Sequence, residues 1–291
     1  MVHFGRVSTA MVTPFDKRGN IDFAKTTKLV NHLISQGTDS LVVAGTTGES
    51  PTLSTEEKLA LFGHVVKAAD GRIPVIAGTG GNNTYASIEL TKKAEETGVD
   101  AIMLVAPYYN KPNQAGLYRH FEAISLATSL PVMIYNIPGR SSVNILPETV
   151  IELSKIDNIV AVKEASGDLD AMAEIIARTD DDFLLYSGDD GLTLPVLSIG
   201  GEGVVSVASH VVGLDMQNMV QLFLDGNHKE AALIHQRLLP LMRGLFHAPS
   251  PGPVKTALQM TGLDVGSVRL PLVPLTETER AALAALLETC K

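Results

Sequence analysis

Short apolar runs rich in Val and Ile recur along the chain, and each is closed by Gly, Pro, Asn, Ser or Thr. Such runs predict buried β-strands. The eight predicted strands are Val7–Val12, Ser40–Ala44, Pro74–Ala77, Ala101–Val105, Pro131–Tyr135, Ile159–Lys163, Phe183–Tyr186 and Gly203–Val207. Between them lie longer segments such as Ser54–Ala69, Thr84–Thr97 and Leu146–Lys155. Their apolar residues return every three or four positions, which predicts amphipathic helices.

Strands that alternate with helices along a chain indicate a parallel sheet. Eight such units close naturally into a (β/α)8 barrel, the TIM barrel, whereas an open doubly wound sheet usually carries a glycine fingerprint after its first strand. This chain lacks that fingerprint. The pattern therefore predicts an α/β fold of the TIM-barrel class.

The strand pattern ends near Asn227. Beyond it, Lys229–Phe246, Pro253–Met260 and Thr276–Thr289 have helical spacing and are separated by Pro and Gly clusters. We therefore predict a TIM-barrel catalytic domain over residues 1–226 and a C-terminal helical domain over residues 227–291.

Composition narrows the class of protein. The chain has 291 residues, 45% of them hydrophobic, and a formal net charge of −9, so it lacks the clustered Lys and Arg of a general nucleic-acid binder. The single cysteine, Cys290, provides neither a disulfide framework nor a cysteine metal site. The first residues do not resemble a signal peptide, and no run of about 18 apolar residues occurs. We expect a cytoplasmic protein that does not bind membranes.

Lys163 is the unusual residue at the end of a predicted strand. Alternation along that strand places Ala161 and Lys163 on one face and Val160 and Val162 on the other. If the valines pack against the helices, the lysine points into the barrel, where burial would depress its pKa and give a nucleophilic amine. Considered alone, a lysine here is more often one that reaches solvent or pairs with the neighbouring Glu164.

Three other segments follow predicted strands with polar groups. The Gly45–Ser50 loop has two threonine hydroxyls between glycines, a pattern that suits close approach to a carboxylate but is equally common in a capped turn. Tyr135 ends a strand, where tyrosine is more often a packing residue. Arg140 follows nearby and is, by itself, more often a solvated charge than an anion clamp.

Taken together and in order, these segments closely resemble the dihydrodipicolinate synthase branch of the pyruvate-dependent class I aldolases, a family that includes N-acetylneuraminate lyase. The resemblance spans nearly the whole chain. The matching motifs are Thr13-Pro14, Gly45–Ser50, Gly78–Gly80, Pro107–Tyr109, Tyr135–Pro138, Val162–Glu164, Ser187–Asp189 and Gly203–Ser206.

The resemblance implies the fold and the chemical roles. It implies a TIM barrel with a helical C-terminal extension, usually a homotetramer of two tight dimers. Lys163 would form the Schiff base with pyruvate, and Tyr135 would donate and accept protons. Thr46 and Tyr109 would complete the proton relay, with Tyr109 reaching across the tight-dimer interface.

The resemblance also implies the substrate contacts. Thr47 would hold the pyruvate carboxylate through its hydroxyl and amide, and Val205 and Gly188 would lie in the same pocket. Arg140 would bind the carboxylate of the second substrate at the mouth of the site, as the planar fork of a guanidinium suits. No cofactor and no metal are expected.

Within the family, Arg140 and the paired threonines favour pyruvate plus L-aspartate 4-semialdehyde as substrates. The product would then be 4-hydroxy-tetrahydrodipicolinate, in the diaminopimelate route of lysine biosynthesis. Two alternatives stay open at this point: an N-acetylneuraminate lyase or 2-keto-3-deoxy sugar acid aldolase, and a regulatory barrel that binds pyruvate or lysine without turnover.

Feedback control by lysine is the property in which the sequence departs from part of the family. Lysine-inhibited members usually place polar ligands on the helix after the glycine loop and an acidic residue after Gly78–Gly80. The corresponding positions here are Pro51, Thr55, Lys58, Asn82 and Ala86, although Tyr108 is kept. Alanine cannot pair with an amino group and Lys58 would repel one, so we predict weak or absent inhibition.

Overall fold

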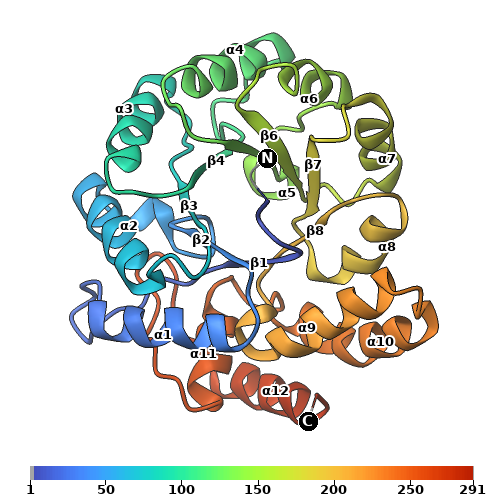
Figure 1. The fold of residues 1–291 in the computed structure, drawn as a ribbon. Coiled ribbons are helices and arrows are strands. Elements are labelled where there is room, and N and C mark those ends of the chain that lie inside the picture. The colour runs from blue at the N-terminus through green and yellow to red at the C-terminus, as the bar shows by residue number, and fades with distance from the viewer. Residues whose placement is uncertain (1–2, 291) are drawn as a thin grey trace.

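The computed structural model describes residues 3–290, and within that range the chain forms a closed parallel barrel surrounded by helices (Figure 1). The strands follow one another around the ring in chain order, and β8 pairs with β1 to close it. They are β1 (Val7–Ala10), β2 (Ser40–Val43), β3 (Val75–Gly78), β4 (Ala101–Val105), β5 (Val132–Asn136), β6 (Ile159–Glu164), β7 (Leu184–Ser187) and β8 (Gly203–Ser206). The predicted fold class is confirmed.

Helices follow the strands and cover the outside of the barrel (Figure 1). They are α1 (Phe23–Ser35), α2 (Thr55–Ala69), α3 (Thr84–Glu95), α4 (Gln114–Ser125), α5 (Pro138–Ser141), α6 (Pro147–Leu153), α7 (Leu169–Arg178), α8 (Thr193–Ser198), α9 (Ser209–Leu224), α10 (His228–Gly244), α11 (Gly252–Met260) and α12 (Glu277–Glu288). Two short 3-10 helices, η1 (Ser50–Thr52) and η2 (Asp190–Leu192), lie in the loops after β2 and β7.

Burial on both sides explains why the strand segments are continuous apolar runs. Side chains of a parallel barrel strand face either the interior or the helix layer, and both are dry. Every residue of β2 is buried, for example, and so is every residue of β3.

Most strands and helices begin and end within two residues of the predicted bounds. Local chemistry explains several of these ends. β3 and β5 each begin one residue later than predicted, because Pro74 and Pro131 have no N–H to donate to the ladder. The start of α2 is fixed by a capping box between Ser54 and Glu57, and Asn83 caps α3. The four-residue helix α5 was not predicted.

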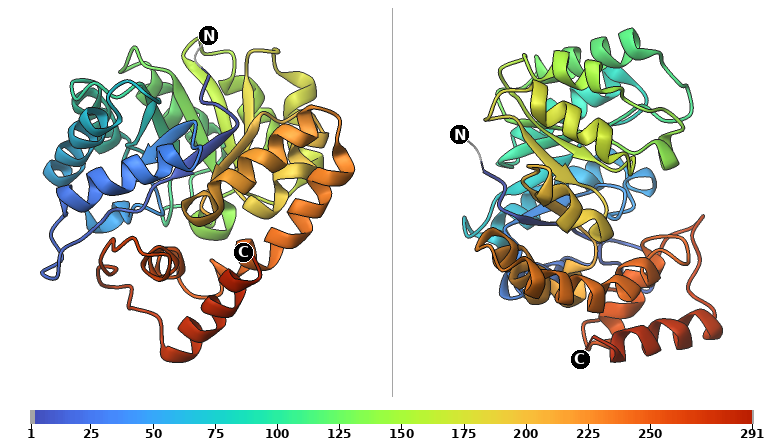
Figure 2. Two further views of the ribbon diagram at one scale, coloured as in Figure 1. Left: turned by 60° about the horizontal axis from the view of Figure 1, so that its bottom comes forward. Right: turned by 90° about the vertical axis from the view of Figure 1, so that its right-hand side faces the viewer.

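Helices α9 to α12 lie together on the side of the barrel opposite α4 (Figures 1 and 2). The predicted boundary between residues 226 and 227 falls in the turn between α9 and α10. Buried residues of α10, α11 and α12 belong to the same hydrophobic core as the barrel strands. The division into two domains stays a prediction. Within residues 3–290, no helix is long and apolar enough to cross a membrane.

Candidate active site

A cavity of about 260 Å³ opens at the carboxyl ends of strands β2 to β5. This is the face of a TIM barrel at which catalytic residues gather. The walls come from the strand ends and the loops that follow them, and they include Thr46, Tyr108, Tyr135 and Arg140.

Lys163 lies beside this cavity on β6, where its side chain is 5% exposed. It is the register partner of Tyr135 on β5, and its Nζ lies 4.1 Å from the centroid of the Tyr135 ring. Burial lowers the pKa of Lys163 from 10.5 to about 7, while Asp190 opposes this shift and Arg140 adds to it. A large share of the amine is therefore neutral near pH 7 and is able to attack a carbonyl.

Glu164 does not act as the counter-ion of Lys163. Its carboxylate accepts hydrogen bonds from Asn136 Nδ2 at 2.9 Å and from the Ser166 amide at 2.6 Å. The same Asn136 accepts from the Ile145 amide at 3.0 Å, so Glu164 links the end of β6 to the loop after β5. This arrangement leaves the lysine inside the barrel without a directly bonded carboxylate of its own strand.

The loop after β7 approaches Lys163 closely. A Cβ atom at Gly188 would lie 3.1 Å from Lys163 Cε and 2.7 Å from Ala165 Cβ, so only glycine leaves room for the lysine stem. Two residues further on, the buried carboxylate of Asp190 accepts from Ser206 Oγ at 2.5 Å and from the amide of Ala208 at 2.9 Å. Asp190 is therefore fixed to the end of β8.

Asp190 is a functional candidate that the sequence did not reveal. The Ser187–Asp190 segment suggests a capped turn, and Asp189 does accept from the Gly191 amide at 2.8 Å. Its neighbour Asp190 bonds to the end of β8 instead, and its negative charge raises the pKa of Lys163. In the sequence, the adjacent acidic residues Asp189 and Asp190 are the signal that could have drawn attention to it.

Tyr135 and Thr46 form the second part of the site. Tyr135 is 4% exposed, and burial raises its pKa to about 12, against the lowering influence of Arg140 and of a hydrogen bond with the Thr46 side chain. The phenol therefore stays protonated near neutral pH. It can donate a proton at the cavity and recover one through the Thr46 hydroxyl.

The Gly45–Ser50 loop is a compact turn. The Glu49 amide donates to the Thr46 carbonyl at 3.1 Å, and Thr13 Oγ1 donates to the Gly48 carbonyl at 2.7 Å. A Cβ atom at Gly48 would lie 3.0 Å from the Cα of Ala44, which explains the glycine. Thr46 lines the cavity, whereas Thr47 is buried and does not.

Arg140 lies on the short helix α5, a helix that the sequence pattern did not predict. Pro138 occupies the first turn, where its missing N–H has no consequence. Arg140 is exposed, lines the cavity and lowers the pKa values of both Lys163 and Tyr135 through its positive charge. Its position at the mouth suits an incoming carboxylate.

The last two predicted residues, Val205 and Tyr109, are not among the residues that line the cavity. Val205 is buried on β8 and does not line the cavity. Tyr109 is 89% exposed with a φ of 74°, and its neighbour Tyr108 lines the cavity in its place. Within one chain Tyr109 does not join the relay of Tyr135 and Thr46.

Among residues 3–290, no three His, Cys, Asp or Glu side chains are grouped to hold a metal ion. The side chains at and beside the cavity offer a buried amine, a protonated phenol, hydroxyls and one guanidinium.

Known proteins resemble this chain over nearly its whole length. The model of the dihydrodipicolinate synthetase family matches residues 3–290. The 4-hydroxy-tetrahydrodipicolinate synthase of Bacillus subtilis is 66% identical over 285 residues, which cover 98% of this chain and 98% of that protein. The crystal structure of a dihydrodipicolinate synthase from Bacillus anthracis is 64% identical, with a TM-score of 0.98 and 99% of each chain covered.

A more distant structure is also similar. It is a dihydrodipicolinate synthase from Cyanidioschyzon merolae with lysine bound, 48% identical with a TM-score of 0.97, covering 99% of this chain and 98% of that one. These matches favour the synthase over the sugar-acid aldolase and the non-catalytic barrel. They confirm the predicted resemblance, and the chain belongs to the dihydrodipicolinate synthetase family.

Proposed function

We propose that this chain condenses pyruvate with L-aspartate 4-semialdehyde to form 4-hydroxy-tetrahydrodipicolinate through a Schiff base on Lys163. The observation that carries the proposal is the buried Lys163 amine, with a pKa of about 7, lying against the Tyr135 ring beside the cavity. The names of the relatives support the same reaction.

The mechanism begins with the neutral Lys163 amine, which attacks the keto carbon of pyruvate. Loss of water gives an iminium ion, an electron sink that acidifies the pyruvate methyl group. The resulting enamine attacks the aldehyde carbon of the semialdehyde and forms the new carbon–carbon bond. The amino group of the semialdehyde then adds to the iminium carbon, closes the ring and releases the Lys163 amine.

Each of these steps moves a proton. Tyr135 donates to the oxygen that leaves pyruvate as water and later to the alkoxide of the aldol product, and Thr46 relays protons to it. A protonated phenol in a dry site is suited to donation, because burial holds its pKa at about 12.

The two substrate carboxylates meet different groups. Thr47 binds the pyruvate carboxylate through its hydroxyl and amide, and Gly188 and Val205 line the pyruvate pocket. Arg140 binds the carboxylate of the semialdehyde. Its place at the mouth of the cavity supports this role, since the second substrate enters after pyruvate is fixed.

We further propose that the protein acts in the cytoplasm as a homotetramer of two tight dimers. The exposure of Tyr109, together with its left-handed backbone, supports a role in a neighbouring subunit's site. A non-glycine residue held at positive φ is a feature that clusters at functional sites. Light scattering after gel filtration would determine the oligomeric state.

A test of the reaction uses pyruvate with three alternative aldehydes: L-aspartate 4-semialdehyde, N-acetylmannosamine and glyceraldehyde. Of the three aldehydes, we expect only L-aspartate 4-semialdehyde to give rapid turnover with pyruvate. Incubation with pyruvate and borohydride should add one reduced pyruvate to the peptide that contains Lys163. Turnover with a sugar aldehyde but not with the semialdehyde would contradict the substrate assignment, and an unmodified Lys163 would contradict the imine.

A further inference from the structure

A buried ion pair connects the C-terminal helices to the loop that carries the threonines. Lys255 on α11 places its Nζ 2.5 Å from Oε1 of Glu49, and the side chains are 2% and 1% exposed. Glu49 is two residues beyond Thr47 and belongs to the turn that contains Thr46. The two charged residues are 206 positions apart in the sequence.

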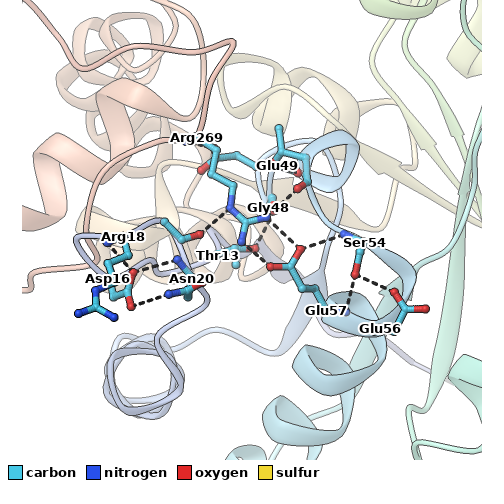
Figure 3. A network of polar contacts seen from close by, with 12 residues as sticks. Thr13, Asp16, Arg18, Asn20, Gly48, Glu49, Ser54, Glu56, Glu57 and Arg269 are labelled. Carbon is cyan, nitrogen blue, oxygen red and sulfur yellow. Dashed lines mark hydrogen bonds and ion pairs between the residues drawn. The ribbon is translucent and has the colours of Figure 1, made fainter.

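The second oxygen of Glu49 is also held by the C-terminal segment. Oε2 accepts from the backbone amide of Arg269 at 2.8 Å. The Arg269 side chain donates to the Thr52 carbonyl at 2.6 Å. It also donates to both carboxylate oxygens of Glu57, at 2.9 and 2.5 Å (Figure 3). Each carboxylate oxygen of Glu49 therefore has its own donor, which fixes the orientation of the group.

Both cations also contact one aromatic ring, that of Phe15. Lys255 Nζ is 4.2 Å and Arg269 Cζ 4.4 Å from the centroid of the buried Phe15 ring, at contact distances for cation–π attraction. Lys255 also donates to the Ser267 carbonyl at 2.8 Å. With Glu49, Ser267 and Phe15 around it, the ammonium has a defined position.

The backbone of Glu49 needs such an anchor. Its φ of 57° and ψ of 36° are left-handed, an uncommon conformation for a residue other than glycine, which costs free energy unless its surroundings stabilise it. The Glu49 amide closes the turn onto the Thr46 carbonyl at 3.1 Å. The backbone of Glu49, which its side-chain contacts hold in place, is therefore bonded directly to Thr46.

We propose that Lys255 and Glu49 are positioning residues that hold Thr46 and Thr47 in the geometry needed for proton relay and for binding of the pyruvate carboxylate. The proposal rests on the function proposed above. It assigns the C-terminal helices a role in the site: α11 contributes Lys255, which bonds to Glu49 and Ser267 and does not line the cavity.

An ion pair such as that of Lys255 and Glu49 is suited to fixing the orientation of the Gly45–Ser50 turn. A buried ion pair adds little net stability, because desolvation offsets most of the attraction, but it is strongly orientation-dependent. The loop lies at the rim of the cavity, and a displacement of about 1 Å in a positioning group is enough to cost on the order of 100-fold in rate.

The test compares Lys255→Met, Glu49→Gln and the double variant with the unaltered protein. Lys25→Met is the matched control, because Lys25 also joins the barrel to the C-terminal segment, through a 2.7 Å ion pair with Asp264, but does not contact the loop. Thermal unfolding reports on the fold. Steady-state kinetics give kcat and KM for pyruvate, and borohydride trapping at saturating pyruvate counts intact Lys163 sites.

We expect each single variant to raise the KM for pyruvate and lower kcat by about tenfold or more, while full trapping at saturating pyruvate persists. In the double variant no charge is left unpaired, so its thermal stability should exceed that of the single variants, yet the kinetic defect should remain. The Lys25→Met control should match the unaltered protein in kcat and KM.

Recovery of kcat and KM in the double variant would overturn the proposal, because the pair would then serve folding alone. Single variants that fold and keep normal kinetics, or failure of all three to fold, would overturn it as well. If the proposed function itself is wrong, the unaltered protein will form no product and trap no pyruvate, an outcome separate from all of these.

Discussion

Replacing Lys163 with methionine should abolish turnover and stabilise the fold. The side chain lies in a dry environment that lowers its pKa from 10.5 to about 7. Since one pKa unit corresponds to about 1.4 kcal/mol, keeping this group in the barrel costs the folded state on the order of 4 kcal/mol at pH 7. Methionine has a similar length, fills the same space and carries no charge, so the variant avoids this cost.

The pH dependence of that gain has a definite sign. Between about pH 7 and 10.5, the unfolded chain keeps the Lys163 proton that the folded chain has lost, so the stability of the unaltered protein rises with pH over this window. Lys163→Met removes this dependence. Its advantage should therefore be largest at and below pH 7 and fade as the pH approaches 10.5.

Denaturant unfolding at fixed protein concentration measures the difference. Equal concentration matters because association would shift the apparent stability. Lys67→Met is the control: Lys67 is an exposed lysine on α2, and its replacement should change the free energy of unfolding by less than about 0.5 kcal/mol. A Lys163→Met variant that is less stable than the unaltered protein at pH 7 would refute the reasoning, and so would one that still traps pyruvate.

Four further outcomes are expected. The rate of borohydride-trappable imine formation should rise with pH to a plateau above about 7, the pKa of Lys163, and a midpoint near 10 would contradict the buried-amine mechanism. Tyr135→Phe should keep imine trapping but lower kcat by about 100-fold or more, since it removes the proton donor; normal kcat would exclude Tyr135 from the relay. Arg140→Ala should raise the KM for the semialdehyde by about tenfold, with the KM for pyruvate unchanged, because a charge-assisted hydrogen bond is lost; an equal rise for both substrates would argue against selective binding. Calorimetric titration with L-lysine should show no micromolar binding, because Lys58 and Ala86 occupy positions where lysine-inhibited relatives carry ligands, and a micromolar Kd would refute the prediction.

The barrel could be predicted because short stretches of sequence determine each of its strands and helices. Each strand is a short apolar run ended by a residue with a specific backbone preference, and each following helix shows its own spacing. Pro74 and Pro131 illustrate the remaining error: they belong to the apolar runs but cannot donate to the ladder, so the strands begin one residue later. Helix α5 was missed because four residues are too few for helical spacing to be recognised.

The site could be predicted in part. Strand alternation placed Lys163 toward the interior, and the structure adds the register that sets it against Tyr135. Composition gave no hint that Asp190 is a source of negative potential near the lysine, because its contacts with β8 depend on how two strand-end loops meet. The roles assigned to Thr47, Gly188 and Val205 came from the resemblance and stay predictions.

The sequence also does not show which residues fix the Gly45–Ser50 loop in position. In the sequence, Glu49 is an acidic residue that follows a glycine, and Lys255 is a basic residue on a predicted helix of the C-terminal segment. Neither pattern indicates that the two side chains meet. Only the fold makes them partners, since it brings Lys255 of α11 against Glu49 and buries both side chains. Burying a charged pair this deeply costs desolvation free energy, which only well-oriented contacts offset. The neighbouring turn carries Thr46 and Thr47, the groups that pyruvate would meet. The C-terminal helices are therefore better regarded as part of the active-site framework than as an appendage to the barrel.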